Sequence, residues 1–246
     1  MGSIIAVLSG KGGTGKTSVC AGVASALAEA GATVLCIDCD VGLRNLDISL
    51  GITDSGTLSF LDILQGGYSL SQAPRHPQYL GLAFLTAPVN MPADKVDADA
   101  FADLLRSARK QFDYILLDAP AGLDAGFRLA AANADRCVVV TGAAPAAVRD
   151  AARVGEVLEI MGRKDVRLVV NRVDKSIFAS MKLTVDDIMD TAGLPLLGIV
   201  PEDNNVVLAA AFGTHLLGYK KRSPAAAAYR NIAKRIQGMP VPITLR

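Results

Sequence analysis

The chain alternates between two kinds of apolar pattern. Seven short runs are largely apolar, and the segments between most of them place apolar residues three or four positions apart. Runs that are apolar on both faces are typical of parallel strands, and the wider spacing is typical of the helices that cover them. The runs span residues 3–9, 33–37, 80–85, 114–117, 137–141, 167–170 and 196–200. We therefore expect a doubly wound α/β fold, a mostly parallel sheet with helices on both faces, in a single domain over residues 1–246.

Composition agrees with a folded domain that does not cross a membrane. Of the 246 residues, 51% are apolar and 20% are charged, which excludes a disordered chain. The long apolar stretch over residues 129–148 is interrupted by Asp135 and Arg136, so no membrane span is expected. The chain enters its first apolar run without the basic segment and cleavage site of a signal peptide. We expect a cytoplasmic protein.

The cysteines and histidines do not predict a disulfide or a transition-metal site. All four cysteines lie within or beside apolar runs, as expected for buried thiols in a reducing compartment. Cys36 and Cys39 form a C-x-x-C pair, a pattern found in iron–sulfur proteins. Residues three apart in a strand face opposite sides of the sheet, so the two thiols are not expected to share a ligand. His76 and His215 are isolated, and surface or packing roles are expected for them rather than metal binding.

A glycine-rich loop with two lysines follows the first predicted strand and precedes the first predicted helix. It fits the pattern G-x-x-x-x-G-K-[ST], in which backbone N–H groups and a helix N-terminus surround phosphate oxygens. We expect Lys16 to contact the β and γ phosphates of a nucleotide and Thr17 to bind Mg²⁺. The expected nucleotide-binding residues here are Gly10, Lys11, Gly12, Gly13, Thr14, Gly15, Lys16, Thr17 and Ser18. Lys11 is not needed for phosphate binding, and the sequence leaves two roles open for it: a solvated loop charge, or contact with a phosphate across a dimer interface.

Carboxylates follow two of the predicted strands at the ends where ligands bind in parallel sheets. Asp118 comes directly after an apolar strand. This position resembles that of a Walker B acid, which orders Mg²⁺ through water. Asp38 and Asp40 lie two residues apart, so they face the same way if the strand continues. That arrangement suits one carboxylate near the metal and one near an attacking water. The alternative is that Asp38 or Asp118 only caps a turn.

Together, KGGTGKT, DCDVGLRNLD, DAPAG, VNR and VPED resemble the deviant Walker A ATPases of the MinD/ParA group, over nearly the whole chain. GLRNLD resembles the MinD branch of that group more specifically than the loop does. The resemblance implies a slow, partner-regulated ATPase with ATP and Mg²⁺, which dimerises with ATP and takes part in placing the division site. Lys11 would then reach the partner subunit's phosphates, and Asp40 would position or activate water, alongside Lys16.

The resemblance also assigns the nucleotide base and the metal. Asn171 and Arg172 would flank adenine, and the turn Pro201, Glu202, Asp203 would border it. The alternative for Asn171 is a helix cap. Magnesium would be held by Thr17, Asp38 and Asp118. Regulators of the MinC/MinE or MinJ/DivIVA type would meet the surface after the fifth strand, where Arg149 and Asp150 are candidate contacts, unless these are simply solvated charges.

The C-terminal region combines a predicted helix with an uneven charge distribution. A helix is expected over about residues 223–237, with Ser223 as its N-cap and Tyr229 in its buried stripe. Members of the family continue into an amphipathic membrane-targeting segment, which residues 239–246, with Pro240 and Pro242, do not resemble. The formal net charge is +1, yet residues 219–246 hold seven Lys and Arg and no acid. We expect lipid, DNA or an acidic partner to be met at this basic surface, and the inner face of the cell membrane is a possible location.

Two other functions remain open. One is a ParA-like factor that partitions DNA or plasmids and binds DNA through a basic surface. The other is a flagellar-placement relative, although such proteins usually carry an N-terminal segment ahead of the first strand, and only Met1 and Gly2 precede it here. Binding to DNA or to anionic vesicles would separate these functions.

Overall fold

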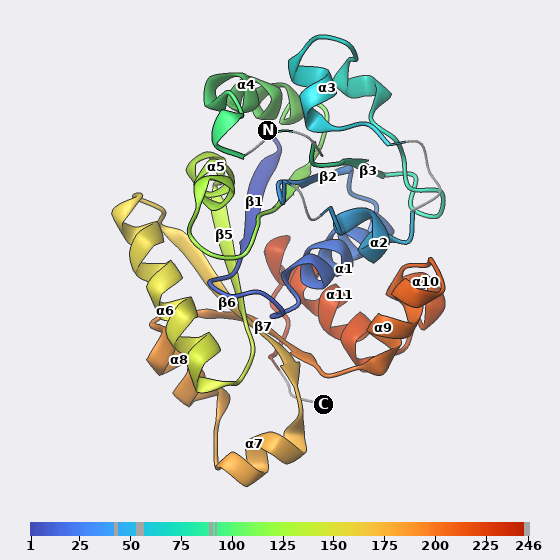
Figure 1. Ribbon diagram of the computed structural model, residues 1–246. Helices are drawn as coiled ribbons and strands as arrows, with labels where there is room; N and C mark the ends of the chain where they lie inside the picture. The colour runs from blue at the N-terminus through green and yellow to red at the C-terminus, as the bar shows by residue number, and fades with distance from the viewer. Residues whose placement is uncertain (42–43, 53–56, 89–90, 92, 244–246) are drawn as a thin grey trace.

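Seven parallel strands form one sheet in the order β3-β2-β4-β1-β5-β6-β7. The computed structural model describes residues 1–41, 44–52, 57–88, 91 and 93–243 (Figure 1). The strands are β1 Ser3–Leu8, β2 Val34–Asp38, β3 Leu82–Leu85, β4 Tyr114–Asp118, β5 Arg136–Thr141, β6 Asp165–Val173 and β7 Leu196–Pro201. Each coincides with one of the seven predicted runs, with ends that differ by a few residues. The predicted fold class is confirmed.

Helices cover both faces of this sheet (Figure 1). On one face lie α1 Lys16–Glu29, α2 Leu46–Leu50, α9 Asn204–Ala211, α10 Leu216–Tyr219 and α11 Pro224–Ile236. On the other lie α3 Phe60–Leu64, α4 Ala98–Ala108, α5 Ala125–Asn133, α6 Pro145–Ile160, α7 Lys175–Met181 and α8 Val185–Ala192. Short 3₁₀ turns span Leu70–Gln72 and Ala93–Lys95. None of the helices among the described residues is long and apolar enough to cross a bilayer.

Strand side chains alternate between two apolar cores, one on each face of the sheet. Cys36 belongs to the core beneath α1, and Cys39 belongs to the opposite core. The prediction that this C-x-x-C pair is split across the sheet is confirmed. All four cysteines are free and buried, and burial raises the pKa of the Cys137 thiol to about 12.

The predicted C-terminal helix is confirmed as α11. The hydroxyl of Ser223 accepts the N–H of Ala226 at the start of the helix, and the ring of Tyr229 is buried against α1. The contact is close enough that a Cβ at Gly22 would lie 2.3 Å from that ring. Gly22 is therefore required for α1 and α11 to approach.

Two cations of the basic C-terminal region make contacts within the chain. Arg230 forms an ion pair with Glu29 and also donates to the carbonyl oxygen of Lys221. Arg235 donates to the carbonyl oxygens of Leu197, Val241 and Pro242, 2.8–3.0 Å away. These two cations serve contacts within the chain. Residues 244–246, including Arg246, lie outside the described residues.

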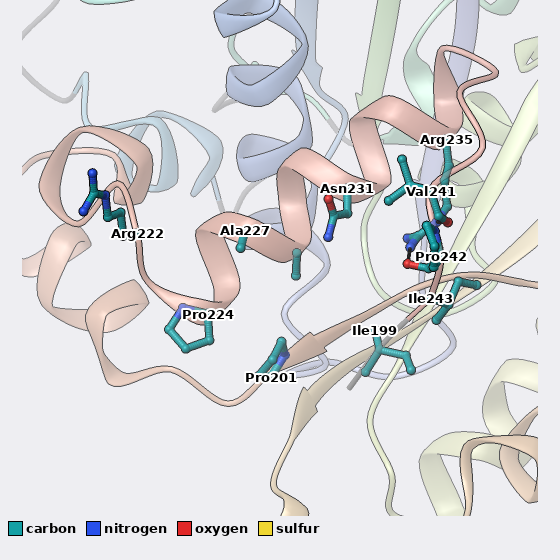
Figure 2. Close-up of a pocket in the computed structure, with 11 residues that line it drawn as sticks. Ile199, Pro201, Arg222, Pro224, Ala227, Asn231, Arg235, Val241, Pro242 and Ile243 are labelled. Atoms are coloured by element: carbon teal, nitrogen blue, oxygen red, sulfur yellow. Dashed lines mark hydrogen bonds between the residues drawn. The ribbon is translucent and has the colours of Figure 1, made fainter. Parts of the chain in front are cut away.

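The Arg235 contacts fix the C-terminal segment beside the edge strand β7. Figure 2 shows Val241, Pro242 and Ile243 next to Arg235 and Ile199, with Asn231 on the neighbouring turn of α11. Between this segment, α11 and β7 lies a mostly apolar cavity of about 420 Å³. The segment thus lies beside β7, near Leu197 and Ile199.

Candidate functional site

The phosphate loop joins the end of β1 to the first turn of α1. Gly13 and Gly15 have φ of 79° and 81°, backbone conformations that side chains rarely adopt, which let the loop fold back over the helix N-terminus. Among the described residues, no oxygen accepts a hydrogen bond from the backbone N–H groups of residues 12–18. A Cβ at Gly12 or Gly13 would meet nothing within 4 Å. The loop is therefore a cradle of free donors with open space in front of it.

Two other glycines of this region allow close approach of distant segments. A Cβ at Gly10 would lie 2.7 Å from the carbonyl oxygen of Asp150 on α6. A Cβ at Gly15 would lie 2.2 Å from Nδ2 of Asn171 at the end of β6. The loop is thus held between α6 and β6 by contacts that any side chain would disrupt.

Lys16 and Asp118 form a buried ion pair at the centre of the site. Lys16 Nζ lies 2.8 Å from Asp118 Oδ1, and both side chains are almost fully buried. Burial acts to lower the pKa of Lys16, but the charge of Asp118 and their hydrogen bond raise it on balance. Burial also raises the pKa of Asp118, against the opposing charge of Lys16. The ion pair satisfies the lysine in the absence of phosphate.

Asp38 lies beside Asp118, because the two residues are in register at the carboxyl ends of β2 and β4. One oxygen of Asp38 accepts the N–H of Asp40 at 2.9 Å, and the other accepts those of Asn45 and Leu46 at 3.3 and 3.2 Å. Burial, followed by the charge of Asp118, raises the pKa of Asp38 to about 7 despite these hydrogen bonds. Asp38 therefore organises the loop after β2 as well as facing Asp118.

The loop after β2 explains two features of the sequence. The strand ends at Asp38, so the condition under which Asp38 and Asp40 were expected to face the same way is not met. In the GLRNLD stretch, Arg44 forms an ion pair with Asp47, while Asn45 and Leu46 donate to Asp38. Gly42 and Leu43 of this stretch lie outside the described residues. The described part of the motif folds back onto the carboxylate at the end of β2.

These residues fit a nucleotide phosphate group together with Mg²⁺. The free N–H groups of the loop match phosphate oxygens, and Thr14 Oγ1 is buried without a partner among the described residues. Lys16 Nζ lies 2.8 Å from Asp118 Oδ1 and 3.5 Å from Thr17 Oγ1, and Asp38 is in register with Asp118, so the three side chains predicted to hold the metal lie close together. Mg²⁺ typically combines one or two protein oxygens with phosphate oxygens and waters. The donor set therefore suits the predicted ion.

The residues predicted around the base divide into two groups. Asn171 Nδ2 donates to the carbonyl oxygen of Thr14 at 2.8 Å, so the alternative that Asn171 caps a helix is wrong. Arg172 has a φ of 57° and makes two hydrogen bonds to Glu202, at 2.9 and 3.2 Å. Asn171 and Arg172 lie near the carboxyl end of β6, and Glu202 directly follows β7. The Asn171–Thr14 hydrogen bond, which braces the phosphate loop, therefore lies next to the exposed Arg172–Glu202 ion pair.

Asp203, predicted near the base, and Asp150, predicted on the α6 surface, both make contacts within the chain. Asp203 accepts the N–H of Asn205 as the N-cap of α9, and it also accepts the N–H of Ala225 at 3.2 Å. Pro201 ends β7. Arg149 is exposed on α6, whereas Asp150 is half-buried against Gly10. The Gly10–Asp150 and Asn171–Thr14 contacts were not predicted, because they join segments more than 100 residues apart with no shared motif.

Both histidines are buried, so of the surface and packing roles expected for them the structure shows packing. His76 is buried with Nε2 2.8 Å from the carbonyl oxygen of Leu50, and burial lowers its pKa. His215 accepts the N–H of Leu217, and burial lowers its pKa to about 3. Over the described residues, no cluster of His, Cys, Asp and Glu is large enough to suggest a further metal site.

Comparison with known proteins gives a consistent result. Residues 5–216 match the family described as "CobQ/CobB/MinD/ParA nucleotide binding domain". The septum site-determining protein MinD of Synechocystis is 37% identical over 244 residues, which cover 98% of this chain and 92% of the relative.

Solved structures agree. A chain of the MinC:MinD cell division protein complex of Aquifex aeolicus superposes with a TM-score of 0.91 at 32% identity, covering 99% of this chain and 98% of that one. MinD of Pyrococcus horikoshii, complexed with Mg-ADP, superposes with a TM-score of 0.84 at 30% identity, covering 96% of both chains. The chain belongs to the CobQ/CobB/MinD/ParA family of nucleotide-binding domains.

Proposed function

We propose that this protein is an ATPase of the MinD type, which hydrolyses ATP to ADP and phosphate and acts in placing the division site. The observation that carries the proposal is the phosphate loop, with its free N–H groups, beside the buried Lys16–Asp118 pair. The relatives named MinD, and the Pyrococcus structure with Mg-ADP, support ATP and Mg²⁺ as the ligands.

Each residue of the site has its own role in the proposed hydrolysis of ATP. The loop N–H groups and Lys16 bind the β and γ phosphates and stabilise charge on them in the transition state. Asp118, now paired with Lys16, would hold the hydrated metal, and Thr17 would supply a hydroxyl oxygen ligand. When bound, Mg²⁺ neutralises phosphate charge. Asp40, half-exposed on the loop after β2, positions the attacking water.

A second copy of the chain completes the site. Lys11 is exposed at the tip of the loop, while the nearby Ser9 hydroxyl donates to the Lys11 carbonyl oxygen at 3.1 Å. The backbone of Lys11 is thereby fixed and its side chain is free to reach outward. In the proposed ATP-bound dimer, Lys11 contacts the partner subunit's phosphates.

The dimer is the form that engages other division proteins. The complex of MinD with MinC in Aquifex supports a MinC-type regulator, and MinE, MinJ or DivIVA proteins are further candidates. Arg149 on α6 is the proposed contact, with Asp150 behind it. The protein is proposed to be cytoplasmic and to attach transiently to the inner face of the cell membrane.

The Lys11→Ala variant tests this mechanism. We expect it to bind ATP nearly as well as the native protein, yet to remain monomeric by light scattering and to lose most phosphate release. Lys16→Ala, as the control, should lose nucleotide binding itself. A persistent ATP-dependent dimer of Lys11→Ala would refute the role in trans, and absence of phosphate release by the native protein would refute the ATPase proposal.

A further inference from the structure

Four large apolar side chains are exposed together on α9 and α10. The exposed fractions are 70% for Val207, 43% for Leu208, 68% for Phe212 and 39% for Tyr219. We call these four residues, together with Lys220, Lys221 and Arg222, the α9–α10 patch. Exposed apolar side chains that gather in one place mark an interaction surface more often than isolated ones do.

Helical spacing explains why the apolar members share one side. Val207 and Leu208 precede Ala211 and Phe212 by four residues, so all four lie on one stripe of α9, while Ala209 faces the core. The rings of Phe212 and Tyr219 stack with centroids 5.7 Å apart and an interplanar angle of 28°. The stack extends the stripe from α9 onto α10, and Figure 1 shows these two helices side by side at the lower right.

The cationic members follow directly on the end of α10. Lys220, Lys221 and Arg222 are all exposed, and no described carboxylate forms an ion pair with them. Arg230 holds the Lys221 carbonyl oxygen, which fixes this turn against α11. Three exposed positive charges therefore follow directly on the apolar stripe, and one of them, Arg222, also borders the cavity between α11 and β7.

The neighbouring acids do not neutralise these charges. Glu29 is paired with Arg230, and Glu202 is paired with Arg172. Asp203 is the N-cap of α9, where it accepts backbone N–H groups. The local field at the patch is positive although the chain as a whole carries only +1.

We propose that the α9–α10 patch docks on an anionic lipid bilayer. Phe212, Leu208 and Val207 enter the region between the headgroups and the acyl chains, and the three cations contact lipid phosphates. Contact with nucleic acid phosphates needs only the cations, whereas a bilayer interface takes up the exposed apolar side chains as well, so the combination favours lipid. The proposal rests on the proposed membrane attachment and names the surface responsible, which is part of the described chain before residue 239.

Co-sedimentation with vesicles tests the proposal. The full chain, with ATP or ADP, is mixed with vesicles of phosphatidylcholine alone or of phosphatidylcholine and phosphatidylglycerol in equal amounts. The native protein should sediment with the anionic vesicles only. The triple variant Lys220→Gln/Lys221→Gln/Arg222→Gln should bind about a hundredfold more weakly, since each cation contributes about 1 kcal/mol near such a surface. Phe212→Ser should weaken binding roughly tenfold.

Matched controls come from elsewhere on the surface. Ile160→Ser removes an apolar side chain that is 82% exposed at the end of α6. Lys164→Gln/Lys175→Gln/Lys182→Gln removes three exposed charges outside the patch. Both controls should bind vesicles like the native protein.

The outcomes separate this proposal from the ATPase proposal. ATP-dependent phosphate release is measured in parallel for every variant, and all should retain it. The patch proposal is overturned if the native protein binds no vesicles, if the controls lose binding as the patch variants do, or if the triple variant loses DNA binding instead. It is also overturned if Phe212→Ser abolishes the ATP-dependent dimer, because the patch would then be a contact between copies. None of these results bears on whether ATP is hydrolysed.

Discussion

Asn171 donates from Nδ2 to the carbonyl oxygen of Thr14, 2.8 Å away, and so ties the end of β6 to the phosphate loop across 157 positions of sequence. Asn171 is only 3% exposed, and the close approach requires a glycine at position 15. The loop is therefore held in shape from outside before any phosphate binds.

Replacing Asn171 with Ala should weaken nucleotide binding by about tenfold. The variant leaves the loop N–H groups intact but removes the hydrogen bond that braces the loop. The loop must then be ordered when the nucleotide binds, which lowers the affinity. Isothermal titration with Mg-ADP measures the change. Asn133→Ala, which removes an amide bonded only within α5, is the control and should bind normally. Equal affinities for the two variants would show that the brace is dispensable.

Stability without nucleotide should fall as pH rises between about 4 and 7. Asp38 has a pKa of about 7 in the folded protein, above the 3.8 of an ordinary carboxyl, so the folded state binds more protons in this window. Folding is therefore favoured at lower pH, and the advantage is lost as Asp38 ionises, an effect of up to a few kcal/mol. Urea denaturation across this range should show the slope. Asp38→Asn should flatten it, and an unchanged slope in that variant would assign the effect to other groups.

Gly22→Ala should destabilise the protein by about 1–3 kcal/mol, although the same change in an open helix is stabilising. The added Cβ would lie 2.3 Å from the Tyr229 ring, so α1 and α11 must separate. Thermal unfolding measures the effect. Shortening the opposing side chain in Gly22→Ala/Tyr229→Leu should make the alanine less costly than it is against tyrosine. If Gly22→Ala is as costly beside leucine as beside tyrosine, the contact is not the cause.

Arg230→Ala should lower the free energy of unfolding by about 1 kcal/mol. Arg230 connects α11 to Glu29 on α1 with two hydrogen bonds, but the pair is partly exposed, which limits its contribution. The comparison is Arg153→Ala, whose ion pair with Glu156 lies within α6 and is exposed on both sides. That variant should change stability by only a few tenths of a kcal/mol. A double-mutant cycle with Glu29→Ala isolates the pair itself.

The sheet and the phosphate loop could be predicted because their determinants are local. A buried parallel strand must be apolar on both faces, and a loop that surrounds phosphate needs glycines and a lysine at fixed spacing. The position of Asp118 follows in the same way from the strand that precedes it. The approach of Asp38 to Asp118 follows from parallel register, which aligns the ends of β2 and β4.

What could not be predicted depends on contacts between distant segments. Nothing near Asn171 in the sequence indicates that its amide reaches Thr14, and nothing near Gly10 indicates that α6 lies against it. The contacts of two cations in the C-terminal region could not be predicted for the same reason. Counting residues treats Arg230 and Arg235 as free cations, whereas folding commits one to Glu29 and the other to backbone carbonyls.

The position of Arg235 has a consequence for how molecules of this protein meet. β7 is an edge strand, and an unprotected edge can pair with the edge of another molecule and lead to aggregation. The guanidinium of Arg235 donates a hydrogen bond to the Leu197 carbonyl oxygen of β7 and another to the Pro242 carbonyl oxygen. It thereby holds the C-terminal segment beside β7, and Pro240 and Pro242 in that segment have no N–H to donate. One carbonyl of the edge strand is thereby engaged within the chain, next to a segment whose prolines cannot continue a ladder. Both features disfavour extension of the sheet by a second molecule at this point of β7.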